Sequence, residues 1–328
     1  MKAIVLSGFG DRTALQLADV PMPEPGPGEV LVRHEYIGVN FFDVYMREGL
    51  YARSPAYGVP LPFCLGIEGA GVVVSTGANV ADLAVGDRVA YCEALGSYAE
   101  FAAVPDHRAI KLPPKFDTRE AAAIMLQGLT AHFLTHSAFP LAPGHVCLVH
   151  AAAGGVGQLL TRLARARGAR VLATVGSDEK AAIARECGAE EVFPYRRVDF
   201  LDEVMDATDG AGVDVVFDSV GRDTIMRSLR SLKPRGTCVL FGHASGQPDP
   251  VSPKLLGELG SLYLTRAHLI HYMLTPDEYR QRVEALFGYL ATGELNVTVD
   301  QVYPLTEAAD AHQRLEERLT KGKILLRP

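Results

Sequence analysis

The sequence predicts an α/β protein in which a doubly wound parallel sheet is inserted into a β-rich domain. Three observations support this prediction. Short strand-like runs fill the first third of the chain, strands and helices alternate from about residue 145, and two helices and a strand form the tail. We expect the tail to fold back onto the first domain, which makes that domain discontinuous.

The first third is rich in Val, Tyr and Ile and is divided by Gly- and Pro-rich turns. The predicted strands are 29–39, 68–76, 86–92 and 97–104. Many short strands between turns indicate an antiparallel barrel or sandwich. A helix is predicted at 118–138, where apolar residues recur at helical spacing.

The middle of the chain alternates apolar strands with helices. The predicted elements are, in order, strand 145–150, helix 157–168, strand 170–175, helix 178–187, strand 213–219, helix 222–232 and strand 236–242. Strands that are apolar throughout are typical of a parallel sheet covered by helices on both faces. The tail follows with helix 275–293 after the N-cap Thr275, helix 305–319 with Thr306 as N-cap, and a final strand KILLRP.

Composition excludes several classes of protein. The 328 residues carry a net charge of −7, with 48% hydrophobic and 22% charged residues, which is ordinary for a globular protein. The acidic balance argues against nucleic-acid binding through bulk positive charge. Five scattered cysteines without a CxxC pair predict neither a disulfide framework nor a clustered zinc site. No signal peptide or membrane span is predicted, so we expect a cytoplasmic protein.

The strongest motif is HAAAGGVG at 150–157, which follows a predicted strand and opens a predicted helix. The spacing Ala151-x-x-Gly154-x-x-Gly157 is a variant of G-x-G-x-x-G. Small residues let the backbone approach a pyrophosphate, whose charge then lies at the helix N-terminus. The alternative is a tight turn that binds nothing. The βα units that follow favour a Rossmann dinucleotide-binding domain.

The end of the second strand of that domain predicts which dinucleotide binds. An NAD-binding unit usually places an Asp or Glu there to hold the ribose 2′-hydroxyl. Here the strand ends in Gly176 and Ser177, and Lys180 follows one helical turn later. The missing carboxylate leaves room for a 2′-phosphate, and Lys180, Tyr195 and Arg196 are candidates to complete its pocket. The sequence therefore predicts NADPH rather than NADH.

The whole chain resembles the zinc-free quinone oxidoreductases of the medium-chain dehydrogenase/reductase superfamily, a group that includes zeta-crystallin, and within it the bacterial NADPH:quinone reductases. The segments that carry the resemblance are PMPEPGPGEVLV, IGVNFFDVYMREGLY, GIEGAGVV, VGDRVAY, QGLTA, HAAAGGVG, TVGSDEK, FDSVG, LFGHASG and GSLYLTR. It implies a GroES-like β-barrel catalytic domain at 1–122 and 267–328, interrupted by an NADPH-binding Rossmann domain at 123–266. It also implies a homodimer formed through edge strands of the Rossmann domains.

The resemblance implies a site without metal. Members of the alcohol dehydrogenase branch hold zinc with a Cys and a His, and the matching positions here are Asn40 and Ile67. Ile cannot ligate zinc, and the lobe of four close cysteines is also missing, since residues 90–105 hold only Cys92. Without a Lewis acid, hydride transfer needs an acceptor that is already electron-poor, such as a quinone or a conjugated enone.

The resemblance also implies the roles of individual residues. Asn40, Tyr45 and Tyr51 would form the catalytic site, and Tyr51 would form a hydrogen bond with the acceptor oxygen. The alternative for both tyrosines is packing at a domain edge. Arg266 would reach the cofactor or form an interdomain salt bridge. The implied cofactor-binding residues are Phe41, Asp43, Thr130, Gly154, Gly155, Val156, Gly176, Ser177, Lys180, Tyr195, Ser219, Phe241, Gly242, Arg266 and Arg318.

The predicted function is therefore NADPH-dependent quinone reduction. One alternative is an NADPH-dependent enone or alkenal double-bond reductase, since both activities need an open, metal-free pocket. An alternative of another class is a zeta-crystallin-like RNA-binding or structural protein. A basic strip that could favour RNA, residues 162–170, is interpreted first as the solvated face of a helix.

Overall fold

A computed structural model describes all 328 residues and divides the chain into two compact units. Unit 1 comprises Met1–Leu126, Thr275–Arg280 and Val297–Pro328, and unit 2 comprises Gln127–Leu274 and Gln281–Asn296. These limits differ in the tail from the domains expected from the sequence, because 267–274 and 281–296 group with unit 2.

Helix α8 (Pro276–Thr292) explains this difference. Within unit 2, Arg282 donates hydrogen bonds to Tyr272 O and Ser137 Oγ, each at 2.8 Å. Tyr289 Oη lies 3.2 Å from His136 Nε2. Most of the helix therefore belongs to unit 2. Amphipathic periodicity alone does not predict the contacts that place it there.

Unit 1 contains two β-sheets. The seven-stranded sheet has the order β15 (Val299–Pro304), β16 (Lys323–Arg327), β3 (Glu29–Val39), β5 (Glu68–Thr76), β6 (Arg88–Cys92) and β8 (Ile110–Lys111), and β7 (Phe101–Pro105) also pairs with β3. The three-stranded sheet has the order β2 (Gln16–Asp19), β1 (Lys2–Leu6) and β4 (Phe63–Cys64). Because β16 pairs antiparallel with β3, the tail folds back onto the first domain as expected.

Two local expectations for unit 1 are wrong. The strand expected at 97–104 begins only at Phe101, because Tyr98 instead exchanges backbone hydrogen bonds with Leu65 and Ile4. Thr306 does not cap the last helix. It lies inside the 3₁₀ turn η4 (Leu305–Glu307), and helix α9 (Ala308–Glu316) begins after it. The remaining short helices of the unit are η1 (Arg12–Ala14) and α1 (Phe41–Arg47).

Unit 2 is a doubly wound parallel sheet. Its strand order is β11 (Glu191–Pro194), β10 (Arg170–Val175), β9 (Val146–Val149), β12 (Val213–Asp218), β13 (Leu232–Leu240) and β14 (Tyr263–Arg266). Numbered along the chain, this is the order 3-2-1-4-5-6 of the Rossmann fold, which confirms the predicted architecture. Strands β9, β10 and β12 are apolar and largely buried, as the uninterrupted hydrophobic runs predicted.

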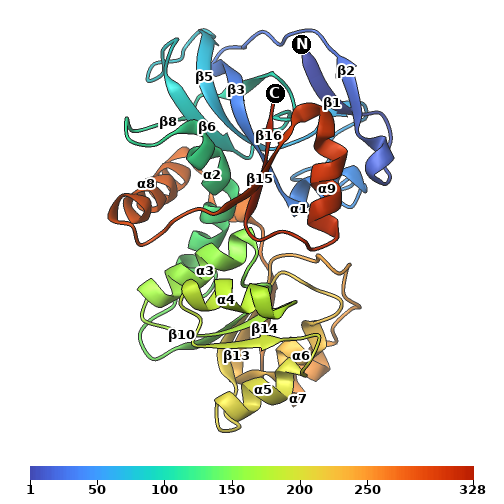
Figure 1. Ribbon diagram of the computed structural model, residues 1–328, viewed down its shortest axis with the longest axis vertical. Helices are drawn as coiled ribbons and strands as arrows, with labels where there is room; N and C mark the ends of the chain where they lie inside the picture. Colours follow the sequence, from blue (N-terminus) through green and yellow to red (C-terminus); the bar gives the residue numbers. More distant parts are fainter. The chain divides into compact units, whose positions relative to one another are not determined.

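Helices cover both faces of this sheet. Figure 1 shows α3 (Gly155–Ala166) and α4 (Asp178–Glu186) on one face, and α5 (Phe200–Ala207) and α6 (Ile225–Arg230) on the other. The remaining helices are α7 (Pro253–Glu258), the 3₁₀ turn η3 (Leu269–Tyr272), and α2 (Thr118–Phe133), which continues as one π-helical turn, η2 (Leu134–Ala138). None of the helices combines the length and apolar character that crossing a membrane requires.

The first turn of α3 packs against the preceding loop so closely that only glycine fits. A Cβ atom added to Gly157 would lie 2.3 Å from Ala151 O and 2.7 Å from Ala152 Cα. Both are backbone atoms, so the helix start or the loop would have to move. This close approach fixes where the N-terminus of α3 stands above the sheet.

We therefore expect Gly157→Ala to lower the free energy of unfolding by about 1–3 kcal/mol, the usual cost of overpacking. Gly288→Ala is the matched control, because Gly288 is a helical glycine of the same unit with nothing within 4 Å of an added Cβ. That change gains helix propensity of up to about 1 kcal/mol. Urea denaturation measures both, and equal stability of Gly157→Ala and the unaltered protein would contradict the close approach.

Candidate functional site

The glycine-rich turn of unit 2 lies between β9 and α3. Ala151 adopts a left-handed backbone with φ 52°, and Gly154 is the N-cap of the helix. The first residues of a helix have N–H groups without intrahelical partners, so Gly155 and Val156 present donors that suit a pyrophosphate. A Cβ on Gly155 would lie 2.0 Å from Gln127 Oε1, so the Gln127 side chain lies directly against this turn.

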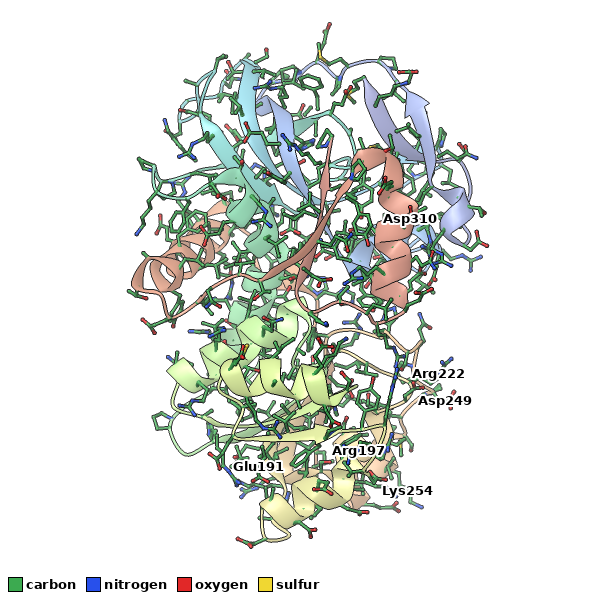
Figure 2. All side chains as sticks on the ribbon, viewed as in Figure 1. Glu191, Arg197, Arg222, Asp249, Lys254 and Asp310 are labelled. Atoms are coloured by element: carbon green, nitrogen blue, oxygen red, sulfur yellow. The ribbon has the colours of Figure 1, made fainter.

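A second group of expected cofactor residues meets at the end of β10. Ser177 caps α4 by accepting a hydrogen bond from Lys180 N, at 3.3 Å. A Cβ on Gly176 would lie 3.0 Å from Tyr195 Oη, which places that hydroxyl at the strand end. The acid that follows, Asp178, pairs with the exposed Arg197 at 2.8 Å (Figure 2). The structure thus brings together Gly176, Ser177, Lys180 and Tyr195 at the end of β10.

The ends of β12 and β13 bring three further expected residues together. Phe241 N donates to Asp218 O at 2.9 Å, and a Cβ on Gly242 would lie 2.7 Å from Ser219 O. Arg266, at the end of β14, donates to Leu240 O and Ala267 O within the same unit. These residues lie at the carboxyl ends of the parallel strands, where ligands bind in open α/β sheets.

Sequence reasoning missed a buried polar network beneath this edge. His150 Nε2 lies 2.9 Å from Ser228 Oγ, which donates to Asp218 Oδ2 at 2.8 Å, and His150 Nδ1 lies 2.8 Å from Thr174 Oγ1. Thr224 Oγ1 also donates to Asp218. Burial lowers the pKa of His150. The network joins the ends of β9, β10 and β12 and so fixes the edge that carries the glycine-rich turn.

In unit 1 the expected catalytic residues lie in an aromatic cluster, which we define as Phe41, Phe42, Tyr45, Tyr51 and Tyr57. Phe42 stacks on Tyr51 with ring centroids 5.3 Å apart, and Tyr57 meets Phe42 edge-on at 4.8 Å. Tyr45 meets Tyr51 edge-on at 6.1 Å, and Phe41 lies 6.0 Å from Tyr45. The cluster joins helix α1 to the residues after it and packs against the core of unit 1.

The Asn40 side chain is engaged inside unit 1. Its Nδ2 donates to Glu68 Oε2 at 2.9 Å, and its Oδ1 accepts from Lys323 Nζ at 2.7 Å. Lys323 Nζ also donates to Glu68 Oε2 at 2.5 Å, and both charged side chains have no exposed surface. Glu68 Oε1 accepts from Leu126 N at 2.7 Å. Asn40 therefore anchors the start of α1 to a buried ion pair.

Asp43 supports the same helix. Asp43 is fully buried, and its Oδ2 atom accepts hydrogen bonds from Asn40 N at 2.8 Å and from Tyr98 Oη at 3.1 Å. Burial raises the pKa of Asp43 to about 7. The contact with the cofactor that the resemblance implies for Asp43 stays a prediction, and in the structure its carboxyl group is hydrogen-bonded within unit 1. The physical reason is the N-terminus of α1, whose N–H groups and dipole attract an acid.

The hydrogen bonds continue from Tyr98 to the last helix. His312 Nε2 lies 3.0 Å from Tyr98 Oη, and His312 Nδ1 lies 3.2 Å from Arg47 Nη1. Burial and the charge of Arg47 lower the pKa of His312 to about 3, so its ring is neutral and Nδ1 accepts from the guanidinium. Arg47 also donates to Glu316 Oε1 at 2.5 Å. This chain of bonds ties α1 to α9.

The residues of this chain do not fit a zinc site. No group of three or more His, Cys, Asp or Glu side chains is placed to hold a metal ion. Of the two positions that match zinc ligands in the alcohol dehydrogenase branch, Ile67 is a buried apolar residue and Asn40 has both polar atoms bonded within the protein. Zinc prefers thiolate, imidazole and carboxylate ligands, which neither residue supplies.

Comparisons with known proteins agree with this organisation. The family model "Alcohol dehydrogenase GroES-like domain" matches residues 26–114, and "Zinc-binding dehydrogenase" matches residues 155–287. A quinone oxidoreductase of Pseudomonas aeruginosa is 42% identical over 328 residues, which is 100% of this chain and 99% of that protein. The chain belongs to the medium-chain dehydrogenase/reductase superfamily. The predicted family and fold are therefore confirmed.

Two further members of the superfamily bear on the activity. A 2-haloacrylate reductase of a Burkholderia species is 42% identical over 314 residues, covering 94% of each chain. The structure of Escherichia coli quinone oxidoreductase complexed with NADPH matches with a TM-score of 0.96 and 39% identity, covering 100% of both chains. The expectation of NADPH as the cofactor is in line with that complex.

Some expected site residues belong to different units. Phe41, Asn40, Tyr45, Tyr51 and Arg318 lie in unit 1. Unit 2 holds Thr130 on α2, together with the glycine-rich turn and the strand-end residues. That the expected residues of unit 1 and those of unit 2 bind the same cofactor stays a prediction.

The buried pair of Lys323 and Glu68 gives a test of how this site is held. Lys323→Met leaves the Glu68 carboxylate buried without its counter-charge, which typically costs about 3–5 kcal/mol of unfolding free energy. We expect the double variant Lys323→Met with Glu68→Gln to recover much of that loss, because no charge then remains buried. Urea denaturation of the three proteins measures both effects. If Lys323→Met has the same unfolding free energy as the unaltered protein, the ion pair does not form in solution.

Proposed function

We propose that this chain reduces quinones with NADPH and does so without a metal ion. The observation that carries the proposal is its full-length match to quinone oxidoreductases together with side chains at the zinc positions, Asn40 and Ile67, that do not serve as zinc ligands. An electron-poor acceptor needs no Lewis acid to accept a hydride, which is the species that NADPH supplies.

The residues of unit 2 are suited to hold the cofactor. The N–H groups of Gly155 and Val156, in the first turn of α3, would bind the pyrophosphate. Lys180, Ser177 and Tyr195, which meet at the end of β10, would bind the 2′-phosphate. Ser219, Phe241 and Gly242 line the carboxyl edge where the ribose and nicotinamide would follow. The side chain of Gln127 lies against the turn.

The aromatic cluster of unit 1 is suited to a flat acceptor. Offset stacking against a quinone ring is favourable for Phe and Tyr faces, and a neutral phenol donates a hydrogen bond to a quinone oxygen. We assign this role to Tyr45 and Tyr51, whose rings meet edge-on. Asn40 acts by positioning α1, because its amide is already bonded to Glu68 and Lys323.

Reduction of an activated carbon–carbon double bond is the second candidate. It is favoured by the 2-haloacrylate reductase that shares 42% identity with this chain. A conjugated acid or enone accepts a hydride at carbon and a proton at the neighbouring carbon or oxygen. The cofactor-binding residues would be unchanged, and only the fit of the acceptor to the aromatic cluster would differ.

We also propose that the protein is a homodimer in the cytoplasm. Strand β14 is an edge of the parallel sheet, and Tyr263 on it is 63% exposed, which suits pairing with a second copy. All five cysteines are free, which suits a reducing compartment. Light scattering gives the mass in solution, and a monomeric mass at micromolar concentration would refute the dimer.

NADPH oxidation with a panel of acceptors tests the proposed reaction. We expect fast turnover with 1,4-benzoquinone and a naphthoquinone, unaffected by a zinc chelator, and no oxidation of a primary alcohol with NADP⁺. Turnover with an enone alone would move the activity to double-bond reduction. Tight NADPH binding without turnover on any acceptor would favour the RNA-binding or structural alternative.

Lys180→Ala tests the choice of NADPH. Loss of a charged hydrogen bond to the 2′-phosphate is worth about 1.5–3 kcal/mol, so we expect the KM for NADPH to rise about tenfold or more while the KM for NADH stays constant. The control is Lys254→Ala, an exposed lysine of the same unit that pairs with Glu258 on the surface of α7 (Figure 2). An equal change for both cofactors would argue against a 2′-phosphate contact.

A further inference from the structure

The glycine-rich turn has a polar neighbour that comes from a different helix. Gln127 lies on α2, and its carboxamide lies against Gly155, the first residue of α3. A Cβ atom built on Gly155 would lie 2.0 Å from Gln127 Oε1, 2.6 Å from Cδ and 2.7 Å from Nε2. The whole amide group is therefore close to the N-terminus of α3, and this holds whichever way round its oxygen and nitrogen are placed.

The burial pattern of α2 singles out the same side chain. From Ala121 to Phe133 the helix is buried except at Gln127 and Thr130, which are both half-buried. Residues three apart lie on the same face of a helix. The accessible face of this stretch of α2 therefore consists of one amide and one hydroxyl, and Thr130 is itself an expected cofactor residue.

The backbone beside Gln127 is held in place. The N–H group of the preceding residue, Leu126, donates a hydrogen bond to Glu68 Oε1 at 2.7 Å. Glu68 in turn belongs to the buried ion pair with Lys323. Because the helix is anchored at the adjacent residue, the position of the Gln127 amide is set mainly by the torsion angles of its own side chain.

Two glutamines contact the glycine-rich turn, and they differ in their partners. Gln158, on α3 itself, is buried, and its Nε2 atom donates to Ala153 O at 2.9 Å, so it holds the turn from within. The carboxamide of Gln127 forms no hydrogen bond with another group of the protein. It therefore keeps both N–H donors and its acceptor oxygen for a ligand.

The donors of Gln127 suit a ligand with phosphate oxygens. The first turn of α3 presents the N–H groups of Gly155 and Val156, which are proposed to bind the pyrophosphate of the cofactor. The Gln127 amide adds two donors beside Gly155, from the side of α2. A hydrogen bond to an ionised acceptor is stronger than one between neutral groups, so one such donor is enough to change the affinity measurably.

We propose that the side-chain amide of Gln127 is a further cofactor-binding group, which donates a hydrogen bond to the pyrophosphate of NADPH. The inference rests on the proposed binding of that pyrophosphate by the first turn of α3. The pyrophosphate is common to NADPH and NADH, so Gln127 contributes equally to the binding of both cofactors. Lys180, which is assigned to the 2′-phosphate, contributes to NADPH alone.

Gln127→Met tests the contact, because Met has a similar size and no donor. Loss of a hydrogen bond to a charged group typically weakens binding about tenfold or more, so we expect the Kd values of NADPH and NADH to rise by the same factor of about ten. Adenosine 2′-phosphate, which lacks the pyrophosphate, is expected to bind with an unaltered Kd. Titration calorimetry without an acceptor measures all three. Gln281→Met, at an exposed glutamine of the same unit, is the matched control.

Gly155→Ala tests the same contact from the other side. The added Cβ atom would meet the end of a flexible side chain, which then has to move away. We expect Gly155→Ala to weaken NADPH binding in the unaltered protein and to weaken it less in a Gln127→Ala background, where no carboxamide has to move. Equal losses in both backgrounds would show that the amide does not lie beside Gly155 when the cofactor binds, and would overturn the proposal.

Gln127→Glu changes the charge at the same position. It places a carboxylate where the amide donors were, and a carboxylate repels a phosphate. We therefore expect the Kd of NADPH to rise further than in Gln127→Met, and a Gln127→Glu protein that binds NADPH as tightly as the unaltered protein would contradict the contact.

Urea denaturation separates a binding role from a structural one. We expect Gln158→Met to lower the urea midpoint, because Ala153 O loses its donor, and Gln127→Met to keep it. A lowered midpoint in Gln127→Met together with weaker binding of adenosine 2′-phosphate would assign a structural role and overturn the proposal, as would unaltered Kd values for both cofactors. If the unaltered protein binds NADPH but reduces no quinone, the proposed reaction fails, whereas these Kd values still test Gln127.

Discussion

The buried ion pair of Lys323 and Glu68 joins the distant parts of the sequence that form unit 1. Neither side chain has exposed surface, so each charge depends on the other, and Asn40 completes the set by bonding to both. Asn40 and Lys323 lie 283 residues apart in the chain. The helix that carries Tyr45 begins at Asn40, so the position of the aromatic cluster depends on a strand that is contributed by the end of the chain.

In unit 2 the strand ends are held together by a buried network of neutral and acidic side chains. Asp218 accepts hydrogen bonds from Thr224, Ser228 and two backbone N–H groups, and Ser228 joins it to His150. The network lies at the carboxyl ends of three parallel strands, below the loops that carry the residues proposed to bind the cofactor. Both units therefore fix their functional loops through buried polar groups whose partners come from distant parts of the sequence, because an unpaired buried polar group is costly.

Strands, helices and turns with a strong local pattern could be predicted from the sequence, whereas contacts between residues far apart in the chain could not. Strands 29–39, 68–76 and 170–175 and the glycine-rich turn carry their structure in their own residues. Lys323 stands in an apolar strand and Glu68 among glycines, and only the fold brings them together. His312 lies in no motif, because its burial and its contacts with Tyr98 and Arg47 arise from tertiary packing. The first half of the tail, 267–274 and 281–296, belongs to unit 2 and not to the first domain as expected, because the hydrogen bonds of Arg282 and Tyr289 that tie it there leave no trace in the periodicity of the sequence.

The pairing of β16 with β3 also determines the order in which the sheets of the two units are completed during synthesis. Unit 2 ends at Asn296, before the last strand leaves the ribosome, and its parallel sheet is built from one continuous stretch. The sheet of unit 1 lacks β16 until Lys323 and the residues after it have been made, and Glu68 has no lysine partner until then. The sheet of unit 1 is thus completed after the sheet of unit 2, and Ile37–Val39 of β3 stay without their β16 partners in the interval.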